Sequence, residues 1–423
     1  MRAELLAVGD ELLYGDIING NAATLGRLLA DVGITVHHSV VVGDDIEVIA
    51  GAVHMALGRA DAVLMTGGIG PTQDDLTREA LALAAGVELR RDEFLEGQLR
   101  RRFRELRRNV PNMNYRQADL PAGADPLPNE RGTAPGVRLE LLGGVAYAMP
   151  GVPHEMLAMF NSSVLPDLLR RAGEPAVVVH RVLHTSGMWE SAVAEAMAPE
   201  VDRLAAEASG AKDRNPTIAF LASGGQTRVR ISARAANRKD AYALIEPVER
   251  FGRAALGEGL YGIDDDTLEG VVHRLLAERG ETVAVAESLT GGLLAGRLTE
   301  TAGASETFRG GVVAYSADLK DALLGTQAQQ RGAVTAETAR LMAQGVRERL
   351  GATWGLATTG VAGPTESEGQ PVGTLYVGLA GPDGAETRHV QLPGERSFVR
   401  TLSVVQALDL LRRELTSRIQ PSA

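Results

Sequence analysis

The stretch ADAVLMTGGIGPT, residues 60–72, joins an apolar run to a glycine-rich loop. The apolar run predicts a buried β-strand. The segment DDLTREALALAAG that follows, residues 74–86, predicts a helix that ends at Gly86. A strand, a glycine loop and a helix in this order place backbone N–H groups where an anion can bind, and the helix N-terminus adds partial positive charge.

The same alternation of strand and helix precedes this stretch. Residues 3–8 and the run ITVHHSVVVGDD predict strands, whereas 21–32 and 46–58 predict helices, the first with Asn21 as its N-cap. This order implies a mostly parallel sheet with covering helices. We therefore expect residues 1–172 to form one α/β domain.

Two segments of this first domain stand out by composition. Residues 90–108 predict a helix with eight arginines and four acidic residues, a local excess of four positive charges. We interpret it as a solvated helix face, with a rim that attracts phosphate as the alternative. Residues 121–136, PAGADPLPNERGTAPG, predict a long loop of the kind that often carries function. GGVAYAMPG at 143–151 predicts another strand.

A smaller domain follows. The segment AGEPA at 172–176 is typical of a linker. Residues 177–255 then have the pattern strand, helix, strand, strand and helix, with the first helix over 189–198. The pattern predicts a small α+β domain over residues 176–256.

A glycine-rich bridge at 256–262 leads to a second strand–helix alternation, which predicts a separate α/β domain over 262–420. Its strand TVAVA, residues 282–286, passes through ESLTGG into a helix over 293–301. Further elements are expected as helices over 267–279, over 335–350 with Thr335 as N-cap and over 398–418, and as strands in FRGGVVAYS, TWGLATTG and VGTLYVGLA.

Composition bounds the class of protein. A chain of 423 residues with 44% apolar and 23% charged residues is ordinary for a globular protein of two or three domains. A net charge of −11 and an aromatic content of 4% argue against non-specific binding to DNA or anionic membranes and against base-stacking surfaces. The sequence shows neither a signal peptide nor an apolar run of membrane-spanning length. We expect a cytoplasmic protein.

The chain contains no cysteine, so disulfides, zinc thiolate sites and a cysteine nucleophile are excluded. A covalent hydrolytic step would have to use Ser, Thr, Lys or a carboxylate. The eight histidines show no HExxH spacing. His180 and His184 lie four apart in a strand-like run, where we expect half-exposed positions without a metal.

The glycine loop at 66–72 is followed by two neighbouring carboxylates, Asp74 and Asp75. A pair of carboxylates beside a phosphate loop is what a divalent metal needs to hold a diphosphate. One of the two could instead cap the helix that follows.

Together with GDELLYGDIINGN at 9–21, VVGDD at 41–45 and MPGVPHEM at 149–156, this motif resembles the molybdopterin-binding fold of MogA- and MoeA-type proteins. The full set in this order resembles the CinA family. The resemblance implies a three-layer α/β domain that hydrolyses ADP-ribose to AMP and ribose 5-phosphate with Mg, Mn or Co. It implies a phosphate cradle of Gly67, Gly68, Gly70 and Thr72, metal or phosphate ligands Asp74 and Asp75, and supporting acids Asp44 and Glu11. The alternative is a domain that binds a pterin or nucleotide without turnover.

The middle segment TIAFLASGGQTRVRISARA resembles the KH-like insert of CinA proteins. A KH domain that binds nucleic acid needs a basic GXXG loop. The corresponding turn, Gly187-Met188-Trp189-Glu190, lacks the second glycine and carries an acid. We therefore interpret this domain as a structural or dimerisation spacer and do not expect it to bind nucleic acid.

In the third domain, AESLTGG at 286–292 places Ser288 between a buried strand and a helix, with glycine N–H groups that could hold an oxyanion or a phosphate. Capping of the helix by Ser288 or Thr290 is the alternative. Tyr315 and Lys320 lie five positions apart at the end of another predicted strand, and a desolvated lysine with a tyrosine can activate a serine. The loop TTGVAGP at 358–364 could supply further substrate contacts.

These three pieces resemble the CinA C-terminal domain, whose family activity is the deamidation of nicotinamide mononucleotide without a cofactor. The resemblance implies that Ser288 is the nucleophile and that Tyr315 and Lys320 activate it. The groups that would bind the substrate or the oxyanion are Glu287, Thr290, Gly291, Gly292, Thr359 and Gly360. The sequence departs from the family at Leu289, where many members have Cys, and at 363–371, which is less glycine-rich.

The sequence thus predicts a bifunctional hydrolase that recycles breakdown products of pyridine nucleotides. Its expected partners are nicotinamide mononucleotide, ADP-ribose and a second copy in a homodimer, with no nucleic acid or membrane. The alternative is a non-enzymatic regulator that binds a protein partner in connection with DNA uptake or damage.

Overall fold

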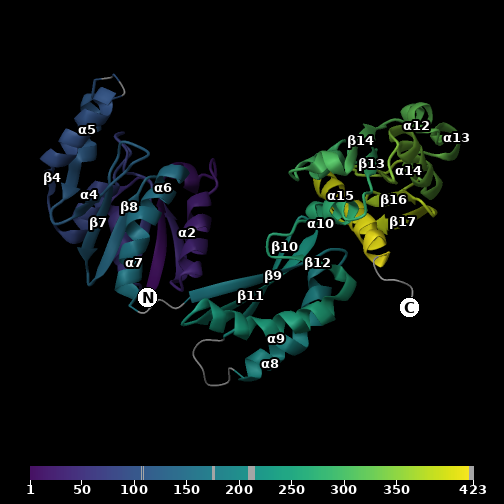
Figure 1. Ribbon diagram of the computed structural model, residues 1–423. Coiled ribbons are helices and arrows are strands. Elements are labelled where there is room, and N and C mark those ends of the chain that lie inside the picture. The colour runs from purple at the N-terminus through teal and green to yellow at the C-terminus, as the bar shows by residue number, and fades with distance from the viewer. Residues whose placement is uncertain (106, 108, 174–176, 208–214, 419–423) are drawn as a thin grey trace. The chain divides into compact units, whose positions relative to one another are not determined.

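The computed structural model describes residues 1–105, 107, 109–173, 177–207 and 215–418. Its contacts divide the chain into two compact units, Met1–Val179 with Arg234–Ala241, and His180–Ala233 with Tyr242–Ala423. Both units are mixed α/β structures (Figure 1).

The first unit is built on a six-stranded sheet. Its strands are β1 Arg2–Val8, β2 Thr35–Val42, β3 Ala62–Thr66, β6 Asp125–Leu127, β7 Gly136–Leu141 and β8 Gly144–Met149. They lie in the order β2-β1-β3-β8-β7-β6, and the pairs β1–β2, β1–β3 and β3–β8 are parallel. The predicted mostly parallel sheet is therefore confirmed. A separate ribbon pairs β4, Leu89–Arg91, with β5, Asp119–Pro121.

Helices cover both faces of this sheet. They are α1 Asp10–Leu13, α2 Gly20–Asp31, α3 Ile46–Leu57, α4 Thr77–Ala85, α5 Glu93–Glu105, α6 Pro153–Met159 and α7 Leu165–Ala172, with short turns η1 Asn112–Ala118 and η2 Phe160–Val164. One core packs α3 and α4 on the sheet through residues such as Val53 and Leu81. The other packs α2, α6 and α7 through Leu29, Met156 and Leu168 (Figure 1). This confirms the predicted three layers.

The structure corrects several local predictions in this unit. The N-cap of α2 is Asn19, whose side chain accepts the N–H of Ala22 at 3.0 Å, and Asn21 is not the cap. The predicted 90–108 helix begins only at Glu93, because residues 89–91 pair as a strand. Residues 106 and 108 lie outside the described residues, as do 174–176 of the predicted linker. The predicted 121–136 loop contains β6, which pairs with the unpredicted β7.

Most of the KH-like segment belongs to the second unit. It comprises β9 Val177–Thr185, α8 Glu190–Glu207, β10 Thr217–Ser223, β11 Gln226–Ala235, α9 Arg238–Leu256, η3 Gly257–Gly259 and β12 Leu260–Ile263. The strands form a sheet in the order β10-β11-β9-β12. The predicted element order is confirmed, although α8 continues through Pro199 well beyond the expected end at residue 198. The sheet also gains β12 from the predicted glycine-rich bridge, and β12 pairs with β9.

The C-terminal part has a five-stranded sheet. Its elements are α10 Leu268–Ala277, β13 Val283–Glu287, α11 Leu293–Thr299, η4 Ala304–Glu306, β14 Phe308–Val313, α12 Ala317–Leu324, α13 Ala328–Arg331, α14 Ala336–Leu350, β15 Trp354–Gly360, β16 Thr374–Gly381, β17 Gly384–Gln391 and α15 Arg396–Ser417. The order is β14-β13-β15-β16-β17, with the first three strands parallel. One core packs α10, α11 and α15 on the sheet, and another packs α12 and α14.

Most elements predicted here are confirmed, including Thr335 as the N-cap of α14. The sequence prediction missed α12 and α13, and α12 carries Lys320 at a fully buried position. Within the described residues, no helix is both long and apolar enough to cross a membrane.

Candidate functional sites

The first candidate site lies where β3 ends. Gly67 has φ 99°, and a Cβ added there would lie 2.2 Å from the carbonyl oxygen of Val8. Only glycine can make this turn, because a side chain would collide with β1. The loop therefore leaves the sheet at the carboxyl ends of its parallel strands, where ligands bind in open α/β sheets.

The side chain of Asp75 is hydrogen-bonded to the backbone of the glycine loop that precedes it. Its carboxylate accepts the backbone N–H groups of Gly70 and Thr72, each at 2.7 Å. Neither Asp74 nor Asp75 caps α4, whose N-cap is Leu76 without a side-chain hydrogen bond. The capping interpretation is thus wrong, and Asp75 instead fixes the shape of the loop.

The buried side chain of Arg78 is hydrogen-bonded to carbonyl oxygens of the same loop. Arg78 is 1% exposed and donates to the carbonyl oxygens of Ile69 and, at 2.7 Å, Gly70. Burial lowers the pKa of Arg78, and nearby acids oppose that effect. Sequence reasoning missed this residue. The sequence does contain a sign of this role: Arg78 lies three positions before Leu81, and residues three apart share one face of a helix, here the face that packs on the core.

These internal bonds leave a smaller anion cradle than the sequence predicts. The N–H of Gly67 donates to Met149 at 3.1 Å, and those of Gly70 and Thr72 go to Asp75. In the described part of the chain, the N–H groups of Gly68 and Ile69 have no acceptor. They are the amides of this loop that can face an anion.

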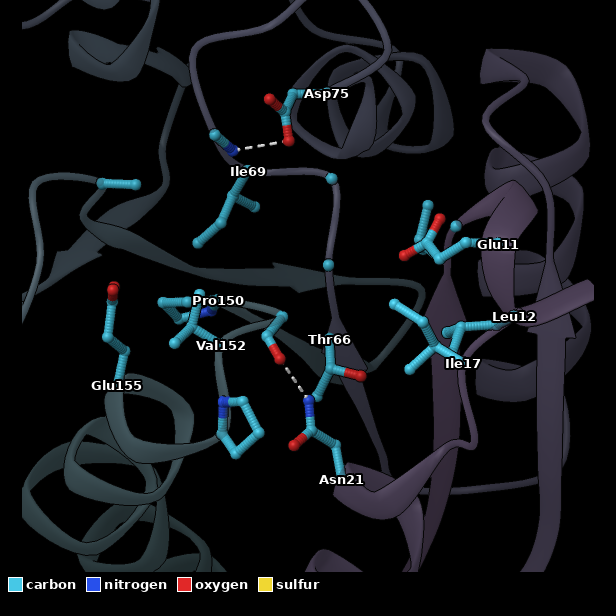
Figure 2. A pocket seen from close by; sticks show the side chains of 18 of the residues that line it. Glu11, Leu12, Ile17, Asn21, Thr66, Ile69, Asp75, Pro150, Val152 and Glu155 are labelled. Carbon is cyan, nitrogen blue, oxygen red and sulfur yellow. Dashed lines mark hydrogen bonds between the residues drawn. The ribbon is translucent and has the colours of Figure 1, made fainter. Parts of the chain in front are cut away.

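The loop borders a pocket of about 640 Å³, within the usual range for small-molecule sites. Figure 2 shows Glu11, Asp75 and Glu155 on three different sides of this pocket, with Ile69 among them. Asn21 also lines it and donates to the carbonyl oxygen of Gly151 at 2.7 Å. The pocket brings Gly67, Gly68 and Gly70 of the predicted cradle together with the four predicted acids Glu11, Asp44, Asp74 and Asp75, whereas Thr72 does not line it.

Acidic side chains gather on one wall of the pocket. Burial raises the pKa of Asp44, and the charges of Asp10, Glu11 and Asp74 raise it further, against a backbone hydrogen bond from Asp10 that lowers it. Among the described residues, no three His, Asp or Glu side chains are grouped closely enough to enclose a metal ion. A divalent ion such as Mg²⁺ is commonly held in proteins by one or two carboxylates together with phosphate and water.

The second candidate site lies at the carboxyl edge of the other sheet. β13 runs between β14 and β15, and Glu287 pairs with Val313 on one side and Thr358 on the other. The residues that follow these three positions therefore meet at one edge. They include Ser288, Tyr315 and Thr359, which the sequence predicted as site residues.

Glu287 caps the helix that follows the serine loop. Its side chain is fully buried and accepts the N–H groups of Gly292 at 2.9 Å, Leu294 at 3.0 Å and Ala295 at 2.8 Å. Ser288 and Thr290 make no cap, so that interpretation is wrong. The prediction that Glu287 contacts the substrate also needs correction, because both of its oxygens already hold the helix N-terminus.

Ser288 is fixed through its backbone. Its N–H donates to the carbonyl oxygen of Thr358 at 3.0 Å, its carbonyl oxygen accepts from the N–H of Gly291 at 3.0 Å, and the residue is 7% exposed. In the described residues its hydroxyl has no hydrogen-bond partner. The N–H groups of Leu289 and Thr290 are likewise without an acceptor there, whereas those of Gly291 and Gly292 are engaged.

The side chain of Lys320 contacts the backbone of Tyr315 and not its phenol. The Nζ of Lys320 donates to the carbonyl oxygen of Tyr315 at 3.3 Å, and the lysine is 2% exposed. Burial lowers the pKa of Lys320, while the charges of Glu368 and Asp321 raise it. A lysine with a lowered pKa is neutral more often and can accept a proton. Neither side chain is hydrogen-bonded to Ser288 in this structure, and such bonds often tighten only when substrate is bound.

Two arginines at the start of α15 were missed by sequence reasoning. Arg400 donates to the carbonyl oxygens of Leu289 at 3.0 Å and Thr290 at 2.8 Å. Arg396 donates to the hydroxyl of Tyr315 at 2.7 Å and to the carbonyl of the next glycine loop. Both line a cavity of about 720 Å³ beside the serine loop. The available signal was two positive charges in the first turns of a helix, where they oppose the helix dipole.

The other predicted substrate residues have partners within the protein. The hydroxyl of Thr359 is buried and donates to Ala333 at 2.7 Å. A Cβ on Gly360 would lie 2.2 Å from the carbonyl oxygen of Thr374, so this glycine allows two strands to approach. The Thr290 hydroxyl pairs with Thr358 at 2.7 Å. These side chains shape the edge of the site, and their hydroxyls are not free for a substrate.

Family models match three successive parts of the chain. They are a probable molybdopterin binding domain over residues 4–170, a damage-inducible protein CinA KH domain over 180–262 and a CinA C-terminal domain over 265–415. A CinA-like protein of Frankia casuarinae is 67% identical over 98% of this chain and 96% of its own. The chain belongs to the CinA family. Its predicted fold, a MogA/MoeA-like domain, a KH-like domain and a CinA C-terminal α/β domain, is thereby confirmed.

The chain is similar to another CinA-like protein and to a solved CinA structure. A CinA-like protein of Gloeobacter violaceus is 45% identical over 98% of this chain and 96% of its own. A solved CinA structure from Thermoplasma acidophilum is 34% identical with a TM-score of 0.37, covering 39% of this chain and 96% of that one. The finer domain limits predicted from sequence, 1–172, 176–256 and 262–420, remain predictions, and residues 419 and 420 lie outside the described part.

Proposed function

We propose that the C-terminal part of this CinA protein hydrolyses the amide of nicotinamide mononucleotide with Ser288 as nucleophile. The observation that carries the proposal is the buried Lys320, with its lowered pKa, on the helix that follows the strand next to that of Ser288. A buried amine whose pKa is lowered by burial is a better candidate for a general base than an ordinary lysine.

The reaction would proceed in two balanced steps. The Oγ of Ser288 attacks the amide carbon while its proton passes to the Nζ of Lys320. The oxyanion faces the unpaired N–H groups of Leu289 and Thr290. Lys320 then protonates the leaving nitrogen, ammonia departs and an ester remains on Ser288. Water attacks that ester, which gives nicotinate mononucleotide and the free serine.

In this scheme Tyr315 positions the site and does not take the proton. Its hydroxyl is held by Arg396, and the side chain is 55% exposed. Its backbone carbonyl orients the amine of Lys320. Lys320, and not Tyr315, is therefore the general base in this scheme, whereas the sequence alone left both residues open.

A direct test is ammonia release from nicotinamide mononucleotide by the full chain. Ser288→Ala should abolish release, whereas Ser316→Ala should keep most of it, because the Ser316 side chain is hydrogen-bonded to the exposed Asp318 and caps no N–H of α12. Circular dichroism would check that both variants fold. Full activity of Ser288→Ala would overturn the assignment, and inactivity of the wild type would favour a non-enzymatic regulator.

We also propose that the N-terminal unit hydrolyses ADP-ribose to AMP and ribose 5-phosphate with a divalent ion. The amides of Gly68 and Ile69 would meet the diphosphate, and Asp44 and Asp74 would hold the ion. Such an ion polarises a phosphoryl oxygen and lowers the pKa of bound water. Release of AMP that stops with EDTA and returns with Mg, Mn or Co would support the proposal; binding without turnover would leave a nucleotide-binding domain.

The homodimer expected from the sequence stays a proposal of its own. Light scattering on the eluting protein would measure the mass directly against the 44.6 kDa of one chain. A mass of one chain at micromolar concentration would reject it.

A further inference from the structure

A second pocket in the C-terminal unit is not part of either candidate site. It has a volume of about 520 Å³ and lies between the sheet of the KH-like segment and the helices α10, α11 and α15. Its volume is within the usual range for small-molecule sites. Ser288, Tyr315 and Lys320 do not line it, although Gly292 and Leu293 of the adjoining helix do.

The floor of this pocket is apolar. It includes Val404, Val405 and Leu408 of α15, which are at most 8% exposed, and the ring of Tyr261. His184 lies beside that ring, with centroids 5.6 Å apart. An aromatic ring of a ligand would find both an apolar surface and two neighbouring rings here.

The charged side chains that line the pocket differ in whether they have an ion-pair partner. Glu269 is 4% exposed and is paired with Arg297 at 2.9 Å, and Asp266 is paired with Arg274 at 3.1 Å. Arg228 is exposed, and within the described residues it makes no ion pair or hydrogen bond. The third acid that lines the pocket, Glu300, lies 3.9 Å from the same Arg297 that pairs with Glu269. Each acid of the pocket thus has an arginine within 3.9 Å, whereas Arg228 has no carboxylate partner in the described part of the chain and is the cation open to an anionic ligand.

Tyr261 supplies a fixed donor in the same space. Burial raises the pKa of Tyr261 to about 12, the charge of Glu269 raises it too, and Arg297, Arg228 and Gln226 oppose the shift. The phenol is therefore protonated at neutral pH and can donate to a ligand. Tyr261 on β12 and Gln226 and Arg228 on β11 belong to the same KH-like sheet, and all three line the pocket.

Gly296 keeps the helical wall open. It lies in the middle of α11, is exposed and lines the pocket, and a Cβ added there would meet no atom within 4 Å. Glycine in a helix costs about 1 kcal/mol relative to alanine. Since no neighbouring protein atom requires the glycine, the free space at this position is consistent with room for a ligand.

We propose that this pocket binds an aromatic anion of the mononucleotide class, with its ring on the apolar floor and its phosphate at Arg228. The bound ligand would contact α11, the helix whose N-terminal amides Glu287 holds directly behind Ser288. The pocket is therefore a regulatory site placed against the helix that follows the serine loop.

Calorimetric titration of the full chain with AMP tests the site, with adenosine and inorganic phosphate as separate titrants. AMP could also occupy the N-terminal pocket, so the variants are chosen to act at one place only. Gly296→Leu fills the pocket while improving helix propensity, and Gly51→Leu, an exposed glycine in α3 with equally open space, is its matched control. Arg228→Ala removes the proposed phosphate contact.

We expect one AMP-binding event to weaken at least about tenfold in Gly296→Leu and in Arg228→Ala, and to be unchanged in Gly51→Leu. Adenosine should bind more weakly than AMP to the wild type, and equally to the wild type and Arg228→Ala. Isotherms that are the same in the wild type and Gly296→Leu would overturn the site. So would binding of inorganic phosphate alone as tight as that of AMP.

The regulatory effect has a separate measurement that depends on the proposed amide hydrolysis. AMP should change KM for nicotinamide mononucleotide in the wild type and in Gly51→Leu, and should not do so in Gly296→Leu. If the binding event is present and KM does not change, the site binds a ligand but does not regulate Ser288. If ammonia release is absent altogether, the amide hydrolysis fails while the binding result still stands.

Discussion

The carboxylate of Glu287 accepts a hydrogen bond from the backbone N–H of Leu294 at 3.0 Å. It accepts two more from Gly292 and Ala295, and no part of the side chain is exposed to solvent. A buried charge is tolerated when it is fully hydrogen-bonded, and a helix N-terminus is where an anion is most favourable. The neighbouring Ser288 is thereby held between a strand end and a fixed helix end.

Glu287→Gln keeps the size of this side chain but replaces one acceptor oxygen with an NH₂ group that must face a backbone N–H. We expect the free energy of unfolding of the C-terminal part to fall by about 1–3 kcal/mol. Ammonia release from nicotinamide mononucleotide should fall as well, because the serine loop loses its anchor. Urea unfolding followed by the fluorescence of buried Trp354 measures the first effect.

The control for this change is Glu300→Gln, an exposed residue at the opposite, C-terminal end of α11 with a weak pairing to Arg297 at 3.9 Å. A surface pair of this kind contributes little to stability. If Glu287→Gln unfolds at the same urea concentration as Glu300→Gln, the carboxylate does not hold the helix as described.

The pH dependence of ammonia release should report Lys320. Burial lowers the pKa of this lysine below the ordinary value of about 10.4, and only the neutral amine accepts a proton. The value of kcat/KM should therefore rise as the pH increases through this lowered pKa and should be lost below it. Glu368→Gln removes a charge that raises the pKa, so the rising limb should move to lower pH.

Glu366→Gln serves as the comparison, because Glu366 is exposed on the same loop and is not among the charges that act on Lys320. An identical pH profile for Glu368→Gln and Glu366→Gln would reject Lys320 as the group that titrates. A shift in both would point to a general effect of loop charge.

The paired hydrogen bonds from Arg400 to the serine loop lead to a third prediction. Arg400 donates through two different nitrogens to the carbonyls of Leu289 and Thr290, and a lysine cannot reproduce this planar pair of bonds. Arg400→Lys should lower kcat for ammonia release on the order of tenfold to a hundredfold through displacement of the loop. Arg388→Lys on β17 should have no effect, and equal kcat values for the two variants would exclude the positioning role.

The sequence predicted the sheets well because their signal is local. Apolar runs such as 62–66 and 283–287 lie on central strands, and the glycines that follow them mark the turns. Elements away from these central strands were harder to predict. β7 has an ordinary alternating pattern beside a loop rich in proline and glycine, and α12 is a short helix of mixed polarity.

The site chemistry was predicted by residue type but not by contact. Ser288 and Thr290 fit the usual capping spacing, yet Glu287 takes the cap because the chain folds back over five to eight positions. Asp75 similarly turns toward the glycine loop that precedes it and away from the helix that follows. Both cases are contacts made across a turn, and no pattern of spacing along a helix predicts them.

The neighbouring acids Asp74 and Asp75 should separate in their effects. Asp75→Asn removes one of the two carboxylate oxygens that accept backbone N–H groups of the loop. We therefore expect the free energy of unfolding of the N-terminal unit to fall by about 1–3 kcal/mol. ADP-ribose should also bind more weakly, with or without metal. Asp74 is exposed, with a pKa lowered first by a hydrogen bond from Thr72. Asp74→Asn should leave the melting temperature unchanged and raise the metal concentration needed for half-maximal AMP release. Thermal melting and AMP release titrated with Mn²⁺ measure the two effects, and the assignment fails if Asp75→Asn melts like the wild type while Asp74→Asn responds normally to metal.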